Sequence, residues 1–335
     1  MFVPPRCPSA CCLFHDHPPR NFFVRDGAYR AKCRNQPVPR FRCRRCRQRF
    51  SRQTFRADRR QKKPHLNAAF FHLMVSCVGQ RQAARCLKVA RRTVERRFRW
   101  LADHARRFHQ NQLRTASLRG PFQLDELESF EANRFQPVTV PILIDRSTFF
   151  VVTSAVGTLR RKGRLTARQK EQRAAHEVRF GRRRSSSDRV VRQVLERLDQ
   201  CVARDRPVVI DSDRKPLYGR LGRQRFGPRF VGRTHDAGAR RDRANPLFPI
   251  NHTNARLRHF LSRLRRRSWC VSKRRAALAG HLDIAALWIN YARGITNRTA
   301  ITPAQALGIA PRAYTLEQLL FWRQELLLLD ESPPD

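Results

Sequence analysis

Acidic residues are scarce in this chain. Its 335 residues include 26 Asp and Glu against 71 Lys and Arg, a formal net charge of +45, and the stretch from Arg243 to Leu282 contains no acid at all. The positive charge is spread over the whole chain, which argues against a disordered basic tail as its source. Such an imbalance in a folded protein indicates a polyanionic partner. Nucleic acid is the first candidate, because each neutralised phosphate releases condensed counterions.

Long apolar runs are also missing. No window of ~18 or more apolar residues exists, so we expect no membrane-spanning helix and no membrane partner. The N-terminal stretch MFVPPRCPSACCLF mixes Pro, Arg and Cys into its apolar residues, unlike a signal peptide. We therefore expect a cytoplasmic, nucleoid-associated protein. Its ten cysteines should bind metal or remain reduced rather than form disulfides.

Residues 1–60 are rich in Pro, Arg and Cys without a sustained hydrophobic period, which predicts a small zinc-ribbon-like domain. Cys43 and Cys46 form a regular C-x2-C knuckle, and Cys7 pairs with Cys11 or Cys12 at a looser spacing. Two thiolate pairs can hold a structural Zn²⁺ tetrahedrally. The gap between the pairs is longer than usual, and unliganded thiols are the alternative. Three further residues could substitute as a ligand: His15, His17 and Cys33.

Residues 61–112 have a helical pattern. A short helix with Ala83 and Ala84, a turn near Val89, and a second helix with Val94 and Phe98 on one side predict a helix-turn-helix domain. The second helix would present a row of arginines to the DNA major groove. The alternative is an ordinary three-helix bundle with a solvated basic face. The arginines are Arg91, Arg92, Arg96, Arg97 and Arg99.

Residues 113–300 alternate strand-like and helical patterns, which predicts a mixed α/β domain. Three strands open it (QLDELESF, VTVPILID and STFFVVTSAV), and RPVVIDSD and RFVG supply two more. We expect helices in DRVVRQVLERLDQCV, over 251 to about 268, and over about 276–291. The basic insertion at about 157–187 is either an exposed helix or a DNA-contacting arm. Residues 301–335 form a C-terminal helical tail suited to packing or dimerisation.

Three aspartates stand out in the expected sheet. Asp125 lies within a strand, where Asp is depleted, and Asp211 and Asp213 end a Val-Val-Ile strand. Open α/β sheets place their active groups at such strand ends, and carboxylates on neighbouring strands can share Mg²⁺ or Mn²⁺ in phosphodiester chemistry. The structural alternatives are a helix cap near Lys215 for Asp211 or Asp213 and an exposed edge position for Asp125.

Taken together, these motifs resemble transposases of the insertion-sequence-one family, DDE-type enzymes with a ribonuclease-H-like fold. CPSACC, FRCRRCRQRFS and GQRQAARCLKVARRTVERRF are similar to the zinc ribbon and helix-turn-helix of that family. QLDELESF and VVIDSDRKPLY resemble its first two catalytic motifs. In the second motif of the family an aspartate lies five residues before a tyrosine. Tyr218 matches that tyrosine, so the resemblance implies Asp213 rather than Asp211. INHTNARLRHFLSRLRRRSWCVSK resembles the third. The resemblance covers about Cys7 to Asn290.

The resemblance departs from the family at the third catalytic position, where Asn251 stands in place of a glutamate. An amide oxygen can ligate Mg²⁺, but it carries no charge and cannot act as a base. A helix N-cap is the structural alternative for Asn251. His252 and Asn254 are alternate ligands, and the fallback acids lie just upstream: Asp236 and Asp242.

At 100° per residue, Asn251, Asn254 and Arg258 share one face of the expected helix, with Leu257 and Leu261 opposite. The resemblance thus implies a transposase with Zn²⁺ in the ribbon and Mg²⁺ or Mn²⁺ at Asp125, Asp213 and Asn251. It would act on double-stranded DNA, element ends and target, as a homo-oligomer. The alternative is a catalytically inactive derivative that binds the ends as a repressor. Further phosphate-binding residues would be Arg258, Arg263, Arg265, Arg266 and Arg267.

Overall fold

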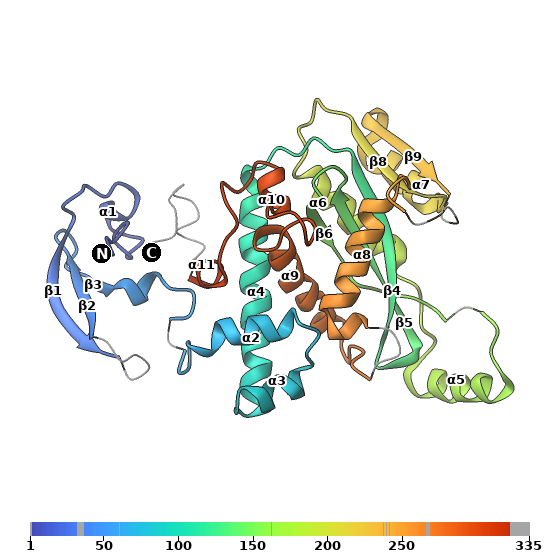
Figure 1. Ribbon diagram of the computed structural model, residues 1–335, viewed down its shortest axis with the longest axis horizontal. Coiled ribbons are helices and arrows are strands. Elements are labelled where there is room, and N and C mark those ends of the chain that lie inside the picture. The colour runs from blue at the N-terminus through green and yellow to red at the C-terminus, as the bar shows by residue number, and fades with distance from the viewer. Residues whose placement is uncertain are drawn as a thin grey trace. The chain divides into compact units, whose positions relative to one another are not determined.

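The structure is a computed structural model that describes residues 2–31, 37–59, 61–161, 163–236, 238, 240, 242–265 and 269–321 (Figure 1). It divides into two compact units, Met1–Phe71 with Tyr314–Asp335, and His72–Ala313. Cys33, Arg266, Arg267 and the tail beyond Phe321 lie outside the described residues. The division differs from the expected borders, since the helix-turn-helix segment shares the second unit with the large sheet.

The first unit contains a small antiparallel sheet of order β1-β2-β3. Phenylalanines fill its core: Phe22 and Phe50 stack at 6.2 Å between ring centroids, and Phe41 lies 5.9 Å from Phe50. These rings surround the buried thiols of Cys7 and Cys43. The elements are α1 (Leu13–Asp16), β1 (Phe23–Arg30), β2 (Pro37–Cys43), β3 (Arg49–Ser51) and α11 (Leu316–Phe321), and α2 (Leu66–Met74) leads into the second unit.

The second unit is built on a mixed sheet of order β6-β5-β4-β8-β9, with β7 paired to β5. β4, β5 and β6 are antiparallel, whereas β8 and β9 run parallel to β4. The expected mixed α/β class and all five strands are confirmed. The strands are β4 (Phe122–Glu131), β5 (Asn133–Asp145), β6 (Val151–Ser154), β7 (Gly157–Thr158), β8 (Val208–Asp213) and β9 (Phe230–His235).

Helices cover both faces of this sheet (Figure 1). Alternate residues of β4 and β5, such as Leu127 and Ile142, pack with Leu257 of α8 and Leu282 of α9 in one buried core. On the opposite face, Glu126 of β4 meets Ser187 at the start of α6. The helices are α3 (Gln80–Cys86), α4 (Arg91–Thr115), α5 (Ala167–Phe180), α6 (Ser187–Asp199), α7 (Pro216–Phe226), α8 (Phe248–Phe260), α9 (Arg275–Tyr291) and α10 (Pro303–Ala306).

The predicted helix-turn-helix is present locally as α3 and α4, with Ala83, Ala84, Val94 and Phe98 buried. α4 packs closely along α9. A Cβ added at Gly280 would lie 2.8 Å from the Cβ of Ala102, and the Phe98 ring lies 5.7 Å from that of His281. This close packing explains why the segment belongs to the second unit instead of forming a domain alone.

The expected helix over 251–268 is wrong at both ends. α8 begins at Phe248, with Leu247 as N-cap and Pro in its first turn, where the missing N–H of proline costs nothing. Asn251 is therefore inside the helix and is not its cap; its N–H donates to the Leu247 carbonyl at 3.0 Å. The helix ends because Leu261 turns extended, at φ −104° and ψ 113°, which lets Leu261 and Leu264 enter the core.

The basic insertion contains an exposed helix. α5 starts with a capping box between Thr166 and Gln169 and has no buried residue. Over these residues the exposed helix is found, and DNA contact by the insertion stays a prediction. No helix within the described ranges combines the length and apolar character needed to cross a membrane.

Two buried histidines predict a pH-dependent stability. Nε2 of His109 donates to the Val152 carbonyl at 2.9 Å and Nε2 of His281 to the Met74 carbonyl at 2.7 Å. Burial lowers the pKa of His109 to about 4 and that of His281 to about 3. In the unfolded chain the two imidazoles take up protons near pH 6.5, whereas in the folded chain they stay neutral there. The free energy of unfolding should therefore fall with pH below that value, by about 1.4 kcal/mol per pH unit for each histidine.

Urea denaturation between about pH 7 and pH 5 measures this slope. His109→Gln should remove the contribution of one histidine to the slope of the unfolding free energy against pH. Above pH 7 the slope of this variant should match that of the parent. Equal slopes below pH 6 in the parent, His109→Gln and His281→Gln would contradict the assignment.

Candidate functional site

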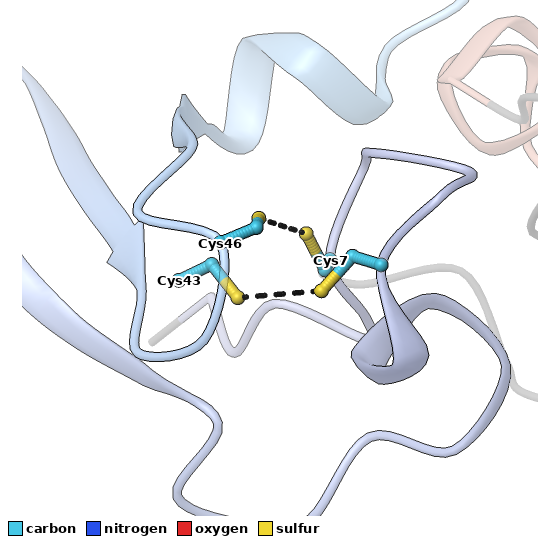
Figure 2. Close-up of side chains that lie close together, drawn as sticks. Cys7, Cys43 and Cys46 are labelled. Carbon is cyan, nitrogen blue, oxygen red and sulfur yellow. Dashed lines mark hydrogen bonds between the residues drawn. The ribbon is translucent and has the colours of Figure 1, made fainter.

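Four cysteine thiols meet in the first unit. The sulfur atoms of Cys7, Cys12, Cys43 and Cys46 all lie within 4.8 Å of one another. Cys7 Sγ lies 3.5 Å from Cys46 Sγ (Figure 2), and Cys12 Sγ lies 3.9 Å from Cys43 Sγ. Burial raises the pKa of the Cys7 thiol, a cost that coordination of a thiolate to a divalent cation would remove. The four thiols could bind a metal such as zinc.

The structure chooses between the alternatives that the sequence left open. Cys12 joins the cluster, whereas Cys11 is exposed and its sulfur lies 3.1 Å from Ser9 Oγ. His15 is not part of this four-residue cluster; its Nδ1 donates to the Cys7 carbonyl at 2.8 Å. β2 ends at Cys43 and brings that residue and Cys46 to the N-terminal loop, which no local spacing rule could show.

A cavity of about 510 Å³ in the second unit gathers most of the predicted catalytic residues. β4 and β8 pair in parallel through Leu124 and Ser212, and the next residues along the two strands are Asp125 and Asp213. Neighbouring strands lie ~4.8 Å apart, so the two aspartates start from adjacent backbone positions. Both line the cavity, henceforth the carboxylate cavity, together with Asn251, His252, Asn254, Arg258 and Asp236.

α8 supplies the amides of the carboxylate cavity. Asn254 is buried and its Nδ2 donates to Asp125 Oδ2 at 2.7 Å. Its Oδ1 is also buried and has no hydrogen-bond partner among the described residues. Asn251 is half-buried one turn earlier. A buried amide oxygen without a donor carries a desolvation cost, which a cation or a water bound beside it would remove.

His252 contributes a neutral ring to the same cavity. The ring stacks on Phe248 at 5.7 Å and meets Phe149 edge-on at 5.6 Å. Burial lowers its pKa, and the charge of Arg256 lowers it further. Its Nδ1 is buried without a partner among the residues described. The two orphaned atoms, on Asn254 and His252, come from the first half of α8.

A polar network behind Asp125 was not predicted from the sequence. Glu126 side-chain oxygens accept hydrogen bonds from Ser187 Oγ at 2.6 Å, Thr139 Oγ1 at 2.9 Å and Tyr218 at 3.2 Å, and Lys215 forms an ion pair with the same carboxylate. Burial raises the pKa of Tyr218, and the charges of Asp125 and Asp213 raise it further. The only sequence signals were the acidic run and the motif tyrosine itself.

The other candidate acids have separate positions. Asp211 is fully buried and pairs with Arg146 at 3.1 Å and His235 at 2.8 Å, and it does not line the carboxylate cavity. Asp242 accepts the Ala244 N–H at 3.0 Å and is also outside the cavity. Asp236 follows β9, is exposed and lines the cavity. Three neighbouring strands therefore deliver three carboxylates: Asp125 from within β4, Asp213 from the end of β8 and Asp236 from just after β9.

The predicted DNA-binding arginines separate into groups. On α4, Arg91, Arg92, Arg96 and Arg99 are exposed and Arg97 is half-buried. Arg258 lines the carboxylate cavity and Arg265 is exposed. Arg263 is half-buried over the Phe98 ring at 5.3 Å, and burial lowers its pKa. Arg263 thus serves packing as well as charge.

The cysteine cluster gives a prediction with a built-in control. Purified protein should contain one equivalent of zinc per chain, and Cys43→Ser should lose it, because three thiolates and a hydroxyl bind Zn²⁺ far more weakly than four thiolates. Cys11→Ser should retain full zinc, since its thiol is outside the cluster. Elemental analysis after exhaustive dialysis measures both. Equal zinc loss in the two variants, or none in either, would contradict the site.

No model of a known protein family matches this chain, and a comparison with curated proteins finds no significant match.

Proposed function

We propose that this chain is the DNA transposase of an insertion element, with a metal-dependent catalytic site in the carboxylate cavity. The observation that carries the proposal is the placement of Asp125 and Asp213 beside each other in one cavity with the buried amide oxygen of Asn254, which has no hydrogen-bond partner in the described part of the chain. Carboxylate and amide oxygens are the ligands that Mg²⁺ and Mn²⁺ favour.

The sheet supports the fold part of the proposal. Three antiparallel strands followed by two parallel ones, in the order β6-β5-β4-β8-β9, match the arrangement of a ribonuclease-H-like fold. In such a fold the first and fourth strands lie together, as β4 and β8 do here. Of the two strands that carry the proposed catalytic aspartates, β4 is therefore the central strand and β8 is its neighbour.

The residues of the cavity fit a divalent cation. Asp125 and Asp213 would hold it, and Asn254, with Asn251 as the alternative, would complete the oxygen set. When bound, the cation would polarise the scissile phosphodiester and stabilise the charge that develops on its oxygens. Asn254 Nδ2 orients Asp125, and the Glu126 network with Lys215 and Tyr218 fixes β4 against α7 behind it.

The proposed reaction is attack of water on the phosphodiester at the end of the element. Water displaces the 3′-oxygen of the element, which leaves as a hydroxyl while the phosphate stays on the flanking strand. The freed 3′-hydroxyl then attacks a phosphodiester of the target and displaces a 3′-hydroxyl of the target strand. Arg258, in the cavity wall, would hold a phosphate next to the reacting bond. The exposed arginines of α4 would bind the double-stranded ends, and phosphate contacts there would position the DNA. Synapsis of two ends favours a homo-oligomer on DNA, and the cysteine cluster would hold a structural zinc.

A catalytically inactive derivative that represses by occupying the ends is the second candidate. The amides of α8 support it, because the resemblance places an acid at Asn251 and an amide cannot act as a base. Asp236 supports the enzyme, since it adds a third carboxylate to the same cavity from the end of β9.

Substitution of the two aspartates separates the candidates. With labelled repeat DNA and Mn²⁺, Asp125→Asn or Asp213→Asn should lower the cleavage rate roughly 100-fold or more, about 2.7 kcal/mol of transition-state stabilisation. Glu128→Gln is the matched control: it removes one charge from the same strand at an exposed position and should cleave like the parent. DNA binding without cleavage in the parent chain would favour the repressor.

A carboxylate added to α8 should change metal binding, and this change can be measured without an activity assay. Asn254→Asp places a carboxylate against Asp125, so the metal-free variant should melt at a lower temperature than the parent. Added Mn²⁺ should raise its melting temperature more than that of the parent, because the new charge joins the ligand set. Asn251→Glu tests the position that the resemblance favours, and more cleavage would show that an acid belongs there. If Mn²⁺ stabilises neither variant nor the parent, the metal site is wrong.

A further inference from the structure

A second cavity in the same unit, of about 1210 Å³, is lined by residues that the proposed active site does not use. Its walls come from α3, the start of α4, the turn between β4 and β5, and the segment before α9. We name it the basic groove. Among the described residues that line it, none is Asp or Glu, and six are cationic: Arg81, Arg85, Arg91, Arg134, Arg263 and Lys273.

The charges of the basic groove are available to a ligand. Arg81, Arg85, Arg134 and Lys273 are exposed. Arg263 is half-buried over Phe98, and Arg91 pairs with Glu95 at 2.8 Å across one turn of α4. A pair this exposed contributes little and exchanges readily for a phosphate. The groove therefore concentrates positive charge beside apolar side chains such as Met74 and Phe98, which strengthens its attraction for an anion.

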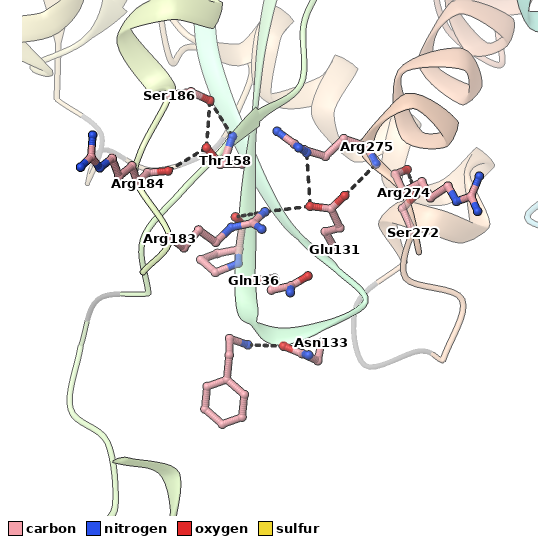
Figure 3. A network of polar contacts seen from close by, with 12 residues as sticks. Glu131, Asn133, Gln136, Thr158, Arg183, Arg184, Ser186, Ser272, Arg274 and Arg275 are labelled. Carbon is pink, nitrogen blue, oxygen red and sulfur yellow. Dashed lines mark hydrogen bonds and ion pairs between the residues drawn. The ribbon is translucent and has the colours of Figure 1, made fainter. Parts of the chain in front are cut away.

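The wall formed by the β4–β5 turn is held rigidly (Figure 3). The Glu131 carboxylate accepts from Arg183 at 2.9 Å and from the Arg275 N–H at 3.1 Å, and it pairs with the Arg275 guanidinium at 3.3 Å. The next residue, Ala132, donates its N–H to the Ser272 carbonyl at 2.7 Å. The Glu131 charge is thus neutralised, and the β4–β5 hairpin that bears Arg134 is positioned before any ligand arrives.

An exposed indole distinguishes the basic groove from an ordinary basic surface. The Trp269 side chain lines it and is 97% exposed. Phe135, also in the wall, is half-buried, and the Arg134 guanidinium lies 5.5 Å from its ring centroid. Aromatic rings among cations are what single-stranded nucleic acid binds, because an unpaired base can stack on a ring while its phosphates meet the charges. The bases of a duplex are already stacked and cannot use the indole in this way.

We propose that the basic groove binds a single-stranded segment of DNA, with phosphates on Arg81, Arg85, Arg134 and Lys273 and one base stacked on Trp269. The inference rests on the proposed function only in taking DNA as the polyanion. It adds a binding site for unpaired nucleotides outside the carboxylate cavity.

Binding of labelled oligothymidylate to the full-length, zinc-loaded protein, without added divalent cation, tests this. Trp269→Ala should weaken binding about 5- to 150-fold, the range for loss of one stacked base, and Trp269→Phe should restore most of it. Arg134→Ala should reduce the slope of log K against log salt by about 0.7. Arg204→Ala, an exposed arginine between α6 and β8, is the matched control and should leave the affinity and the slope unchanged.

Three results would overturn the proposal. Trp269→Ala could bind oligothymidylate as tightly as the parent does. The substitution could weaken the binding of duplex and of single-stranded DNA by the same factor. Its affinity for heparin could fall as much as its affinity for oligothymidylate, which would show that the groove is a general polyanion surface. Since Trp269 is exposed, its removal should not disturb the fold, and circular dichroism checks this. Asp125→Asn should leave oligothymidylate binding intact, so failure of the active site and failure of the basic groove give different results.

Discussion

The parallel pairing of β4 with β8 is the constraint on which the carboxylate cavity depends. The pairing of Leu124 with Ser212 makes Asp125 and Asp213 the next residues of adjacent strands. Gln123, the residue before Leu124 in β4, fixes the start of α8. Its Nε2 donates to the Pro246 carbonyl at 2.6 Å, and its Oε1 accepts the Ile250 N–H at 2.9 Å. A slip of one residue would turn every one of these side chains to the opposite face.

Three acids of the second unit serve as internal anchors. Asp211 binds Arg146 and His235 inside the sheet, and Glu131 binds Arg183 and Arg275 at the hairpin turn. Glu126 binds Lys215 behind the cavity. An acid with cationic partners in the protein adds little negative charge to the surface. The exposed arginines and lysines therefore dominate the electrostatic potential of the surface. The two cavities differ in character: the carboxylate cavity is lined by acids and amides, and the basic groove by cations and an indole.

Sequence patterns predicted the strands and amphipathic helices well, because alternation and 3.6-residue periodicity report directly on burial. The same patterns gave wrong or no predictions where a segment has neither strand alternation nor a continuous helical period. The beginning of α8 was misplaced because proline in a first turn reads as a break in a linear pattern, and its end because Leu261 and Leu264 continue the helical spacing after the backbone has turned extended. The phenylalanine core of the first unit was missed because its rings come from strands and loops without a shared period.

By itself the sequence determined the charge, most element types and the aspartates of the expected sheet. These properties depend on residue identity and local spacing. Only the tertiary structure decided that Cys12 rather than Cys11 completes the thiol cluster, that Asp211 is a buried ion-pair partner, and that Asp236 joins Asp125 and Asp213. It also placed Trp269 among cations from four segments. Each of these outcomes requires residues far apart in the chain to meet, and such meetings follow from sheet register and helix packing, which local patterns do not encode.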